Sequence, residues 1–481
     1  MHLSHIIRAD EILSSEKPLL AEIGKPEADF RKLCPNDVFF CENGFSESEI
    51  TRTNVLTEKG VAAVVTSEGG TERLGNVAVP VIEVENVRKS YALAWSRYLG
   101  EPEKGLRLIA ITGTNGKTSV ASFLYTLLRA ADIPTGLIGT VEYRSVGSET
   151  PSQYTTPPPD ILYPLLADMK QKGITTVVME ASSHAIAQHR LYGLRFETAV
   201  FTNLSRDHLD YHKTWEAYRD VKASLFSHAK NAVLCLSDVQ AKYMGFSASG
   251  NVYYYGNDPS AEFHIQDPIC DENGIRYLLN IGKESIAISF SAVGAFHVEN
   301  SAAAVACAVL EGVPLPMIES AAKRLHSPKG RLEKLVLPTD FSIYLDYAHS
   351  PEALEHALSS LRPMTKKLTV LFGAGGDRDK GKRPQMGAVA ERLADFIILT
   401  DDNPRTEPPD SIIDDIEKGM RGKSHVRIRG RREAILAALK QAQKGEILLL
   451  AGKGHENYII DESGKHPFSE KEIIEKALEL I

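Results

Sequence analysis

The chain has 481 residues, 43% of them hydrophobic and 25% charged, and its formal net charge of −8 argues against nucleic acid as the main partner. Its 5 cysteines, none of them in a CxxC pair, predict a reduced, cytoplasmic protein without a zinc site. The length predicts roughly three domains, and no segment approaches the ~18 apolar residues of a membrane helix, so we expect no membrane insertion.

The first hundred residues alternate short apolar runs with one helical stretch. Val38–Phe40 and Val61–Val65 predict strands, and Val87–Leu99 predicts a helix. The segment Gly100–Gly105 that follows is polar and contains Gly and Pro, which is typical of a boundary. We therefore expect a small α/β domain over residues 1–102.

The next stretch, Leu106–Ser119, reads LRLIAITGTNGKTS and is the most informative part of the chain. An apolar run that ends in a glycine loop with Gly116, Lys117 and Thr118 predicts a strand followed by a phosphate-binding turn. The loop is shorter than the common GxxxxGK[ST] pattern, whose first glycine would fall on Ile111. Roughly a quarter of such bare turns would be ordinary loops. The strand-like run before this glycine loop lowers that risk, so the segment favours nucleoside triphosphate chemistry.

The middle of the chain continues to alternate strand-like and helical segments. Ile174–Met179, Ala199–Asn203 and Ala232–Leu236 predict strands. This rhythm indicates a mostly parallel sheet covered by helices. A second hinge is predicted at His326–Gly330, so the central domain should span residues 103–327.

The last part of the chain repeats the same rhythm. Its predicted strands are Ser342–Tyr347, Leu368–Phe372, Phe396–Thr400 and Ile447–Leu450. Helical segments lie between them, which predicts a Rossmann-like domain over residues 328–481.

Polar residues that could bind a metal follow two of the central strands. Glu180 and His208 could converge beside the phosphate loop, because ligands bind at the carboxyl ends of parallel strands. For either residue alone, a capped strand end or a solvated loop has about even odds. Lys222 falls in the helical pattern of residues 215–226, where the pattern alone predicts a surface lysine roughly three times in four.

The terminal domain has four polar segments at strand ends. Asp346–His349 could contact a ribose or base, and the basic loop Gly373–Pro384 has glycines that allow close ligand approach, although such charge runs are usually solvated. Asp402–Arg405 and Gly452–Glu456 follow the next strands. The arginine that ends the first of these can hold a carboxylate through two parallel hydrogen bonds, and the glutamate that ends the second can hold an ammonium. The pair favours a zwitterionic amino acid.

Taken together, these stretches resemble the ATP-dependent Mur ligases. The resemblance extends from about Leu106 to the end of the chain. Its matching stretches are GTNGKTS at 113–119, TTP at 155–157, MEASSHAIAQHR at 179–190, FTNLSRDHLDYH at 201–212, DYAHSPEAL at 346–354, GGDRDKGKRP at 375–384, DNPR at 402–405 and GKGHE at 452–456. It implies an α/β protein of three domains: one for a UDP-linked substrate, a central P-loop-type ATPase with a mostly parallel sheet, and a C-terminal Rossmann-like domain for the amino acid.

The resemblance also implies a reaction. A substrate carboxylate attacks the γ-phosphate of ATP, an acyl phosphate forms, and an amine displaces phosphate to leave an amide. The expected acceptor is UDP-N-acetylmuramoyl-L-alanyl-D-glutamate, a peptidoglycan precursor. The expected amine is meso-diaminopimelate rather than L-lysine, because Arg405 of DNPR offers its distal carboxylate a cationic partner. ATP and Mg²⁺ are the implied cofactors, and we expect a monomer that binds small molecules.

Residues matched to the nucleotide and the metal lie in the central domain and just beyond it. The family's nucleotide positions fall on Gly113, Thr114, Asn115, Gly116, Lys117, Thr118, Ser119, Asn300, Arg331 and Asp346. The metal neighbours fall on Thr118, Glu180, His208 and Lys222, and Lys117, Lys222, His208 and Glu180 form the implied catalytic set. Lys222 matches a lysine that becomes carbamylated in members of the family. Because carbamylation needs a neutral amine, we expect its pKa to be depressed.

The matched substrate positions form two sets. Those for the muramoyl dipeptide are Thr155, Thr156, Ser182, Gln188 and Arg190. Those for diaminopimelate are Arg378, Asp402, Asn403, Pro404, Arg405, Gly452 and Glu456.

The chain departs from the family pattern at three positions. Phe30 stands where Asp-Ser-Arg has its serine, Tyr154 stands where an asparagine precedes Thr-Thr, and His297 replaces the first asparagine of GxFNxxN. Two of these departures are on the acceptor side, which leaves open a paralogous ligase that joins an amino acid to another carboxylate. A non-catalytic nucleotide-binding module is the other alternative, disfavoured because all four catalytic matches are present. DNPR and GKGHE argue against a folylpolyglutamate synthetase.

Overall fold

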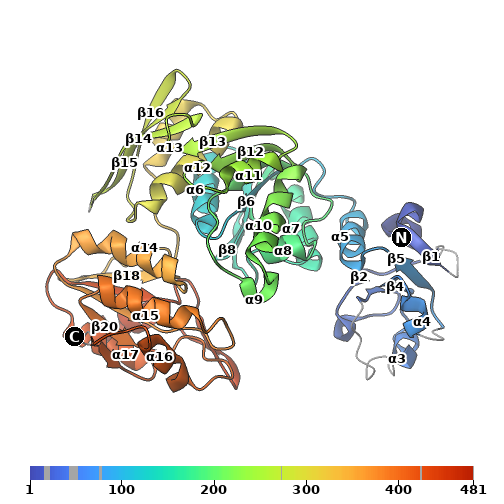
Figure 1. Cartoon of the computed structure of the whole chain (residues 1–481). Helices are drawn as coiled ribbons and strands as arrows, with labels where there is room; N and C mark the ends of the chain where they lie inside the picture. Colours follow the sequence, from blue (N-terminus) through green and yellow to red (C-terminus); the bar gives the residue numbers. More distant parts are fainter. Residues whose placement is uncertain (16–21, 43–52, 75–77, 272, 423–424, 480–481) are drawn as a thin grey trace.

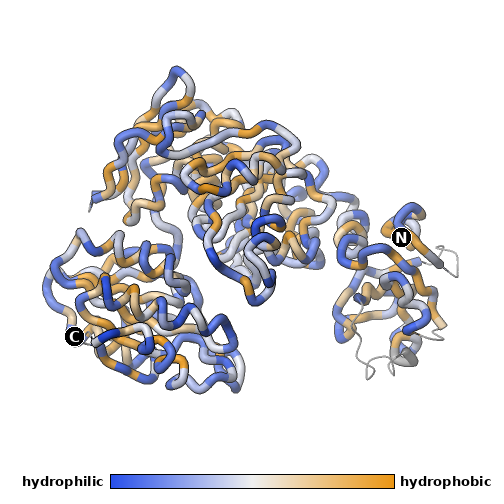
Figure 2. The backbone as a smooth tube through the Cα atoms, viewed as in Figure 1, coloured by the Kyte–Doolittle hydropathy of each residue, from blue (hydrophilic) through white to orange (hydrophobic). Residues whose placement is uncertain are grey.

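The computed structural model describes residues 1–15, 22–42, 53–74, 78–271, 273–422 and 425–479. These residues form three α/β units in chain order, coloured blue, cyan to yellow, and orange to red in Figure 1. Apolar segments lie mostly inside each unit, around its sheet (Figure 2). The three-domain α/β architecture expected from the sequence is the one observed.

The first unit is a five-stranded sheet in the order β1-β5-β4-β3-β2. Its strands are β1 (Ile12–Ser15), β2 (Pro26–Glu27), β3 (Val38–Phe40), β4 (Ala63–Ser67) and β5 (Val81–Val84), of which β1 alone pairs antiparallel. Its helices are α1 (Leu3–Ile6), α3 (Thr53–Glu58), α4 (Gly70–Leu74) and α5 (Val87–Tyr98). Helix α5 begins at Val87 because the Asn86 side chain accepts a hydrogen bond from Lys89 N at 3.0 Å.

The second unit is an eleven-stranded sheet in the order β16-β15-β14-β13-β12-β11-β6-β10-β7-β8-β9. Its strands are β6 (Arg107–Thr112), β7 (Thr135–Ile138), β8 (Glu142–Ser145), β9 (Ser148–Pro151), β10 (Thr176–Glu180), β11 (Phe196–Phe201), β12 (Ala229–Cys235), β13 (Asn251–Gly256), β14 (Phe263–Asp271), β15 (Gly274–Ile281) and β16 (Glu284–Phe290). Its helices are α6 (Lys117–Ala130), α7 (Pro159–Gln171), α8 (Ser183–Ala187), α9 (Leu209–His212), α10 (Trp215–Ala223), α11 (Ala241–Phe246), α12 (Phe296–Leu310) and α13 (Leu315–Ala322).

The strands β7, β10, β6, β11, β12, β13 and β14 run parallel, as expected, and each predicted central strand is present with its ends shifted. The antiparallel extensions at both edges, β8–β9 and β15–β16, were not predicted. In β16 alternate residues are exposed, the period-2 pattern of a half-buried antiparallel strand.

The third unit is a six-stranded sheet in the order β17-β18-β22-β19-β20-β21, parallel except for β17. Its strands are β17 (Glu333–Lys334), β18 (Ser342–Asp346), β19 (Leu368–Phe372), β20 (Phe396–Leu399), β21 (His425–Arg427) and β22 (Ile447–Ala451), and a hairpin adds β23 (Tyr458–Asp461) and β24 (Gly464–Pro467). Its helices are α14 (Pro351–Leu361), α15 (Lys382–Leu393), α16 (Pro409–Glu417), α17 (Arg431–Gln441) and α18 (Glu470–Leu478).

The register of the central sheet brings three strand ends together. Glu180 of β10 pairs with Ile111 of β6, and Phe201 of β11 pairs with Thr112 of β6. Since the three strands are parallel neighbours, their carboxyl ends lie side by side, and the chain leaves the sheet there after each of them. The glycine loop after β6 therefore lies between the segments that follow β10 and β11.

Candidate active site

The loop between β6 and α6 is held in a shape that only glycine tolerates at two positions. Gly113 has φ 151° and Gly116 has φ 87°. A Cβ at Gly113 would lie 1.8 Å from Thr202 Oγ1, and one at Gly116 would lie 2.5 Å from Asn300 Oδ1. Thr202 Oγ1 also donates to Asn115 O at 2.6 Å. The loop is thus fixed against the β11 end, and the first turn of α6 presents backbone N–H groups suited to an anion.

Two lysines converge on this loop. Lys117 Nζ donates to Gly113 O at 3.0 Å and to Thr114 O at 2.9 Å, and Lys222 Nζ donates to Gly113 O at 2.8 Å. Lys222 is only 1% exposed, so the interpretation of this residue as a surface lysine is wrong. Helix α10 is docked on the loop, because Tyr218, one turn before Lys222, places its hydroxyl 3.0 Å from Thr114 Oγ1.

The surroundings of Lys222 disfavour its charged form. Burial lowers its pKa well below the usual value, and the nearby Lys117 cation lowers it further, while Asp207 acts in the opposite direction. Burial also lowers the pKa of Lys117. The depressed pKa of Lys222 agrees with the expectation for a lysine that reacts as a neutral amine.

Glu180 contacts the first turn of α6 through Thr118. It is 1% exposed, and its Oε2 accepts from Thr118 Oγ1 at 3.1 Å and from Thr140 Oγ1 at 2.8 Å. Thr140 N donates to Oε1 at 2.8 Å. The carboxylate is thereby oriented toward the phosphate loop, beside the Thr118 hydroxyl.

His208 follows the end of β11. It adopts φ 53° at the start of α9, and its Nε2 lies 3.3 Å from Asp207 Oδ2. Burial lowers its pKa to about 4, so the ring is neutral at pH 7. His208 lines a different cavity from Thr118 and Glu180, although the charges of Lys117 and Lys222 still act on it.

The Thr118 and Glu180 pair fits a magnesium ion, since both offer oxygen atoms, the ligand type that Mg²⁺ prefers. Among the residues that the structure describes, no group of three or more His, Cys, Asp or Glu side chains could hold a metal by itself. A magnesium ion here would accordingly take its other ligands from phosphate oxygens and water.

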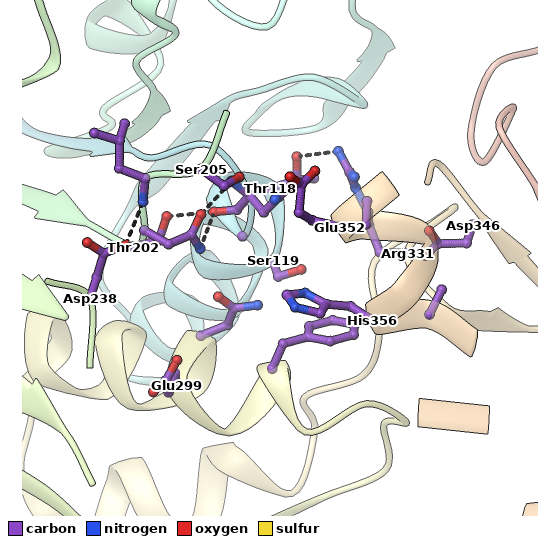
Figure 3. Close-up of a pocket in the computed structure, with 18 of the residues that line it drawn as sticks. Thr118, Ser119, Thr202, Ser205, Asp238, Glu299, Arg331, Asp346, Glu352 and His356 are labelled. Atoms are coloured by element: carbon purple, nitrogen blue, oxygen red, sulfur yellow. Dashed lines mark hydrogen bonds between the residues drawn. The ribbon is translucent and has the colours of Figure 1, made fainter. Parts of the chain in front are cut away.

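A cavity of about 330 Å³ adjoins the start of α6 and lies between the second and third units. Figure 3 shows Thr118 and Ser119 on one side of it and His356 of α14 on the other. The predicted nucleotide residues Asn115, Gly116, Asn300, Arg331 and Asp346 also line it. The structure thus brings this set together across the hinge.

Arg331 and Asp346 are held differently at this cavity. Arg331 Nη2 donates to Thr118 Oγ1 at 3.5 Å, which joins the third unit to the phosphate loop. Asp346 accepts from Leu332 N at 2.7 Å and from Ala348 N at 2.8 Å. Those backbone bonds fix the Asp346 carboxylate at the end of β18, where a ribose hydroxyl could meet it.

The residues matched to the acceptor form a connected group beside Glu180. Thr156 Oγ1 donates to Glu180 O at 2.7 Å and lies 3.2 Å from Ser182 Oγ. Arg190 donates to Thr156 O at 2.7 Å and to Gln188 Oε1 at 2.7 Å. Thr155 Oγ1 lies 3.0 Å from Thr140 Oγ1. Hydrogen bonds therefore connect all five predicted positions, directly or through Thr140 and Glu180.

A second cavity, of about 570 Å³, contains the residues matched to diaminopimelate. Its lining includes Arg378, Asp402, Asn403, Arg405, Gly452 and Glu456 from the third unit, with His184 and residues 206–211 from the second. Pro404 is the exception, because it is buried behind the cavity with its carbonyl against Gly376. Burial and the neighbouring Arg378 lower the pKa of Arg405, as expected where cations gather.

Several contributors to these sites were not among the site residues predicted from the sequence. Asn203 accepts from Thr114 N through its carbonyl at 2.8 Å, and its Oδ1 accepts from Asn115 N at 2.9 Å. His349 and Lys382 line the larger cavity together with Asp207, and both help to lower the pKa of Asp207. Asn203 is the last residue of a predicted strand, which was an available signal, whereas the interactions of Asp207 with His349 and Lys382 depend on how two domains meet.

The three departures from the family pattern have distinct surroundings. Phe30 lies in a 3₁₀ turn whose first backbone groups are capped by Asp29, which accepts from Arg31 N at 3.0 Å. Tyr154 is 41% exposed, with the Arg190 guanidinium 5.8 Å from its ring centroid. His297 is fully buried on α12, where its Nε2 lies 3.4 Å from Ser327 Oγ of the hinge.

No helix among the described ranges combines the length and apolar character that crossing a bilayer requires.

Comparison with known proteins gives a consistent result. Residues 111–308 match the Mur ligase middle domain, and residues 330–454 match the Mur ligase, glutamate ligase domain. The chain is 39% identical over 454 residues, 94% of this chain and 93% of the relative, to the UDP-N-acetylmuramoyl-L-alanyl-D-glutamate–2,6-diaminopimelate ligase of Caldanaerobacter subterraneus subsp. tengcongensis.

Solved structures are similar along the whole length of the chain. A UDP-N-acetylmuramoyl-L-alanyl-D-glutamate–2,6-diaminopimelate ligase superposes with a TM-score of 0.71 at 33% identity, covering 100% of this chain and 99% of its own. The MurF ligase of Thermotoga maritima, in complex with ADP, has a TM-score of 0.62 at 17% identity over 95% of this chain and 98% of its own. At that identity, the second structure shows a common fold alone.

Proposed function

Because this chain belongs to the Mur ligase family, it is an ATP-dependent ligase, and we propose that it joins meso-diaminopimelate to UDP-N-acetylmuramoyl-L-alanyl-D-glutamate during peptidoglycan precursor synthesis. One observation carries the proposal most directly. Glu352 lines both the smaller and the larger cavity, so a nucleotide in the first would lie next to an amino acid in the second. An acyl phosphate made at one could be captured by an amine held in the other.

The smaller cavity is assigned to ATP. Its adenosine end would meet Asn300 and Asp346, and its phosphates would lie against the N-terminus of α6. Lys117 and Arg331 contact the phosphate loop, so they would offset charge on the transferred phosphoryl group. Magnesium would be held by Thr118 and Glu180, and when bound it supplies charge neutralisation and phosphate alignment.

Lys222 is assigned a second role beside the loop. A neutral amine that adds CO₂ loses a proton and becomes a carbamate, which turns a cation into an anion. The depressed pKa of Lys222 supports this assignment, because it raises the share of neutral amine at pH 7. An anion at this position would favour a cation close to the phosphates.

The acceptor is assigned to the group beside Glu180, with Arg190 as its nearest cation. The amine is assigned to the larger cavity, where Glu456 would hold an ammonium and Arg405 would hold the distal carboxylate. L-lysine lacks that carboxylate, so it would leave the Arg405 cation without a partner. This difference favours diaminopimelate.

The reaction uses ATP and a UDP-linked substrate, which supports a cytoplasmic site of action. We place the enzyme there and propose that it acts as a monomer, since residues of this chain suffice to line both cavities.

ADP formation over a matrix of acceptors and amino acids tests the proposal. UDP-N-acetylmuramoyl-L-alanyl-D-glutamate with meso-diaminopimelate should give the highest rate. A higher rate with L-lysine would refute the choice of amine. A higher rate with another carboxylate would favour a paralogous ligase, for which the exposed Tyr154 at the acceptor side is the specific observation. ATP binding without hydrolysis in any combination would refute ligase activity in this chain.

A further inference from the structure

Directly behind the larger cavity lies a buried lysine that belongs to none of the assigned sets. Lys453 is 0% exposed and follows Gly452 at the end of β22. Its Nζ donates to Asn403 Oδ1 at 2.6 Å, to Tyr458 O at 2.8 Å and to Glu456 Oε2 at 3.4 Å. An ammonium has three hydrogens, and three acceptors surround this one. Lys453 therefore has no remaining donor for a substrate.

The contact with Asn403 decides which way that amide faces. Its Oδ1 accepts from Lys453 Nζ and also from Ile460 N at 2.9 Å. With two donors on the oxygen, the amide nitrogen must lie on the opposite side, and Nδ2 donates to Glu456 Oε2 at 3.0 Å. Asn403 is thus locked between Lys453 and Glu456.

Glu456 is oriented by the same arrangement. Its Oε2 meets Asn403 and Lys453, and its Oε1 accepts from Tyr458 OH at 3.2 Å and from Tyr347 OH at 3.4 Å. A carboxylate has about four acceptor positions, and these four donors meet all of them. The contacts with Lys453 and Tyr347 are long, at 3.4 Å each, so the plane of the carboxylate is fixed while a weak contact can give way to a substrate ammonium.

The same lysine balances charge at the cavity wall. Its Nζ lies 3.7 Å from Asp402 Oδ1, and Arg431 Nη1 lies 4.0 Å from Asp402 Oδ2. Asp402 and Glu456 would otherwise be two neighbouring carboxylates with little solvent. Removing the Lys453 cation would leave the partly buried charge of these two carboxylates less compensated, with Arg431 still near Asp402.

From these contacts we infer that Lys453 is a positioning and specificity-determining residue for the amine substrate: it fixes Asn403 and Glu456 in the orientation that receives the substrate ammonium, without touching the substrate itself. This inference rests on the assignment of the larger cavity to the amine. It predicts that replacing Lys453 weakens binding of the amine, because Glu456 loses its orientation, and does not change the affinity for ATP or for the acceptor.

The test uses the full-length enzyme with the amino acid that gives the highest wild-type rate in the substrate matrix. Lys453→Met should raise the KM for the amine by about 10-fold to 100-fold, because buried polar partners lose their donor. The KM values for ATP and for the acceptor should stay within about twofold. Lys465→Met is the matched control: Lys465 is exposed, and its Nζ lies 3.6 Å from the centroid of the same Tyr458 ring. That variant should keep the wild-type KM.

A double-mutant cycle separates positioning from general damage. Glu456→Gln, Lys453→Met and the double variant should be strongly non-additive in amine KM, because both changes disable one arrangement. Multiplicative effects, an unchanged amine KM, or equal rises for all three substrates would each overturn the inference. If Lys453→Met does not fold, Lys453→Gln carries the same comparison, and failure of both to fold would assign Lys453 a structural role instead. A wild-type enzyme inactive with every amine would refute the proposed function, an outcome distinct from all of these.

Discussion

Lys117 and Lys222 donate to the same oxygen, the carbonyl of Gly113, at 3.0 and 2.8 Å. One residue comes from the start of α6 and the other from α10, and both are largely withdrawn from solvent. Two cations this close repel each other, so burial and repulsion together favour the neutral amine of Lys222. Sharing this carbonyl brings Lys222 close to the Lys117 cation, which adds to the effect of burial on the pKa of Lys222.

The first prediction concerns Lys222. Lys222→Met should reduce ligase turnover roughly 100-fold or more, since it removes the proposed carbamate anion beside the phosphates. Rigorous removal of CO₂ and bicarbonate should slow the wild-type enzyme, and added bicarbonate should restore it, as measured by ADP release. Lys230→Met, which alters an exposed lysine paired with Glu197, is the control and should behave as wild type. A wild-type rate that is indifferent to CO₂ would exclude carbamylation.

The second prediction concerns the glycine loop. Gly116→Ala should abolish detectable ATP binding in calorimetry, because its Cβ would lie 2.5 Å from Asn300 Oδ1. Gly105→Ala provides a matched control: Gly105 has φ 91° against 87° for Gly116, but no atom lies within 4 Å of its Cβ. The control should lose about 1 kcal/mol of stability from backbone strain and keep ATP affinity. Equal ATP affinity in the two variants would contradict the steric argument.

The third prediction concerns pH and His297. Burial lowers the pKa of His297 from 6.5 to about 3, so between these values the unfolded chain binds more protons than the folded one. The stability that depends on neutral His297 is therefore fully present above pH 6.5 and is lost as the pH falls toward 3. The free energy of unfolding should fall by about 2 kcal/mol between pH 7 and pH 5 for this reason.

Urea denaturation at pH 7 and pH 5 checks this expectation. His297→Asn should lose less stability than wild type on acidification, by about the same 2 kcal/mol. His326→Asn, at an exposed histidine, should retain the wild-type pH dependence. Identical pH dependence in wild type and His297→Asn would show that His297 is not the group responsible.

The fourth prediction concerns Arg405. Its Nη1 donates to Gly376 O at 2.8 Å, which leaves the other guanidinium nitrogens for a carboxylate in the cavity. Arg405→Ala should raise the KM for diaminopimelate by roughly 10-fold to 100-fold, the cost of an unpaired carboxylate. The KM for L-lysine should change little, so the ratio of kcat/KM values between the two amines reports the effect. Parallel losses for both amines would assign Arg405 to a feature that they share.

The sequence was sufficient for the strand ends of the central sheet. An apolar run followed by Gly113–Thr118, and another that ends at Glu180, predicted two groups at one edge. Parallel pairing of β6 and β10 then placed Thr118 Oγ1 3.1 Å from Glu180 Oε2. This was predictable because periodicity identifies strands, and the carboxyl ends of parallel neighbours necessarily meet. The antiparallel edge strands β15 and β16 were missed, since their apolar positions alternate with exposed ones.

What the sequence alone determined, then, is the order of the elements, the glycines of the phosphate loop and the polar groups at the strand ends, because these follow from local spacing. The tertiary structure decided which side chains are buried and which charges share an environment. The helical pattern alone predicted a surface position for Lys222, and no role was predicted for Lys453 within GKGHE. In the structure Lys222 donates to the loop after β6, and Lys453 donates to Asn403 and Glu456. Desolvation and charge proximity act through space, so no local pattern encodes them.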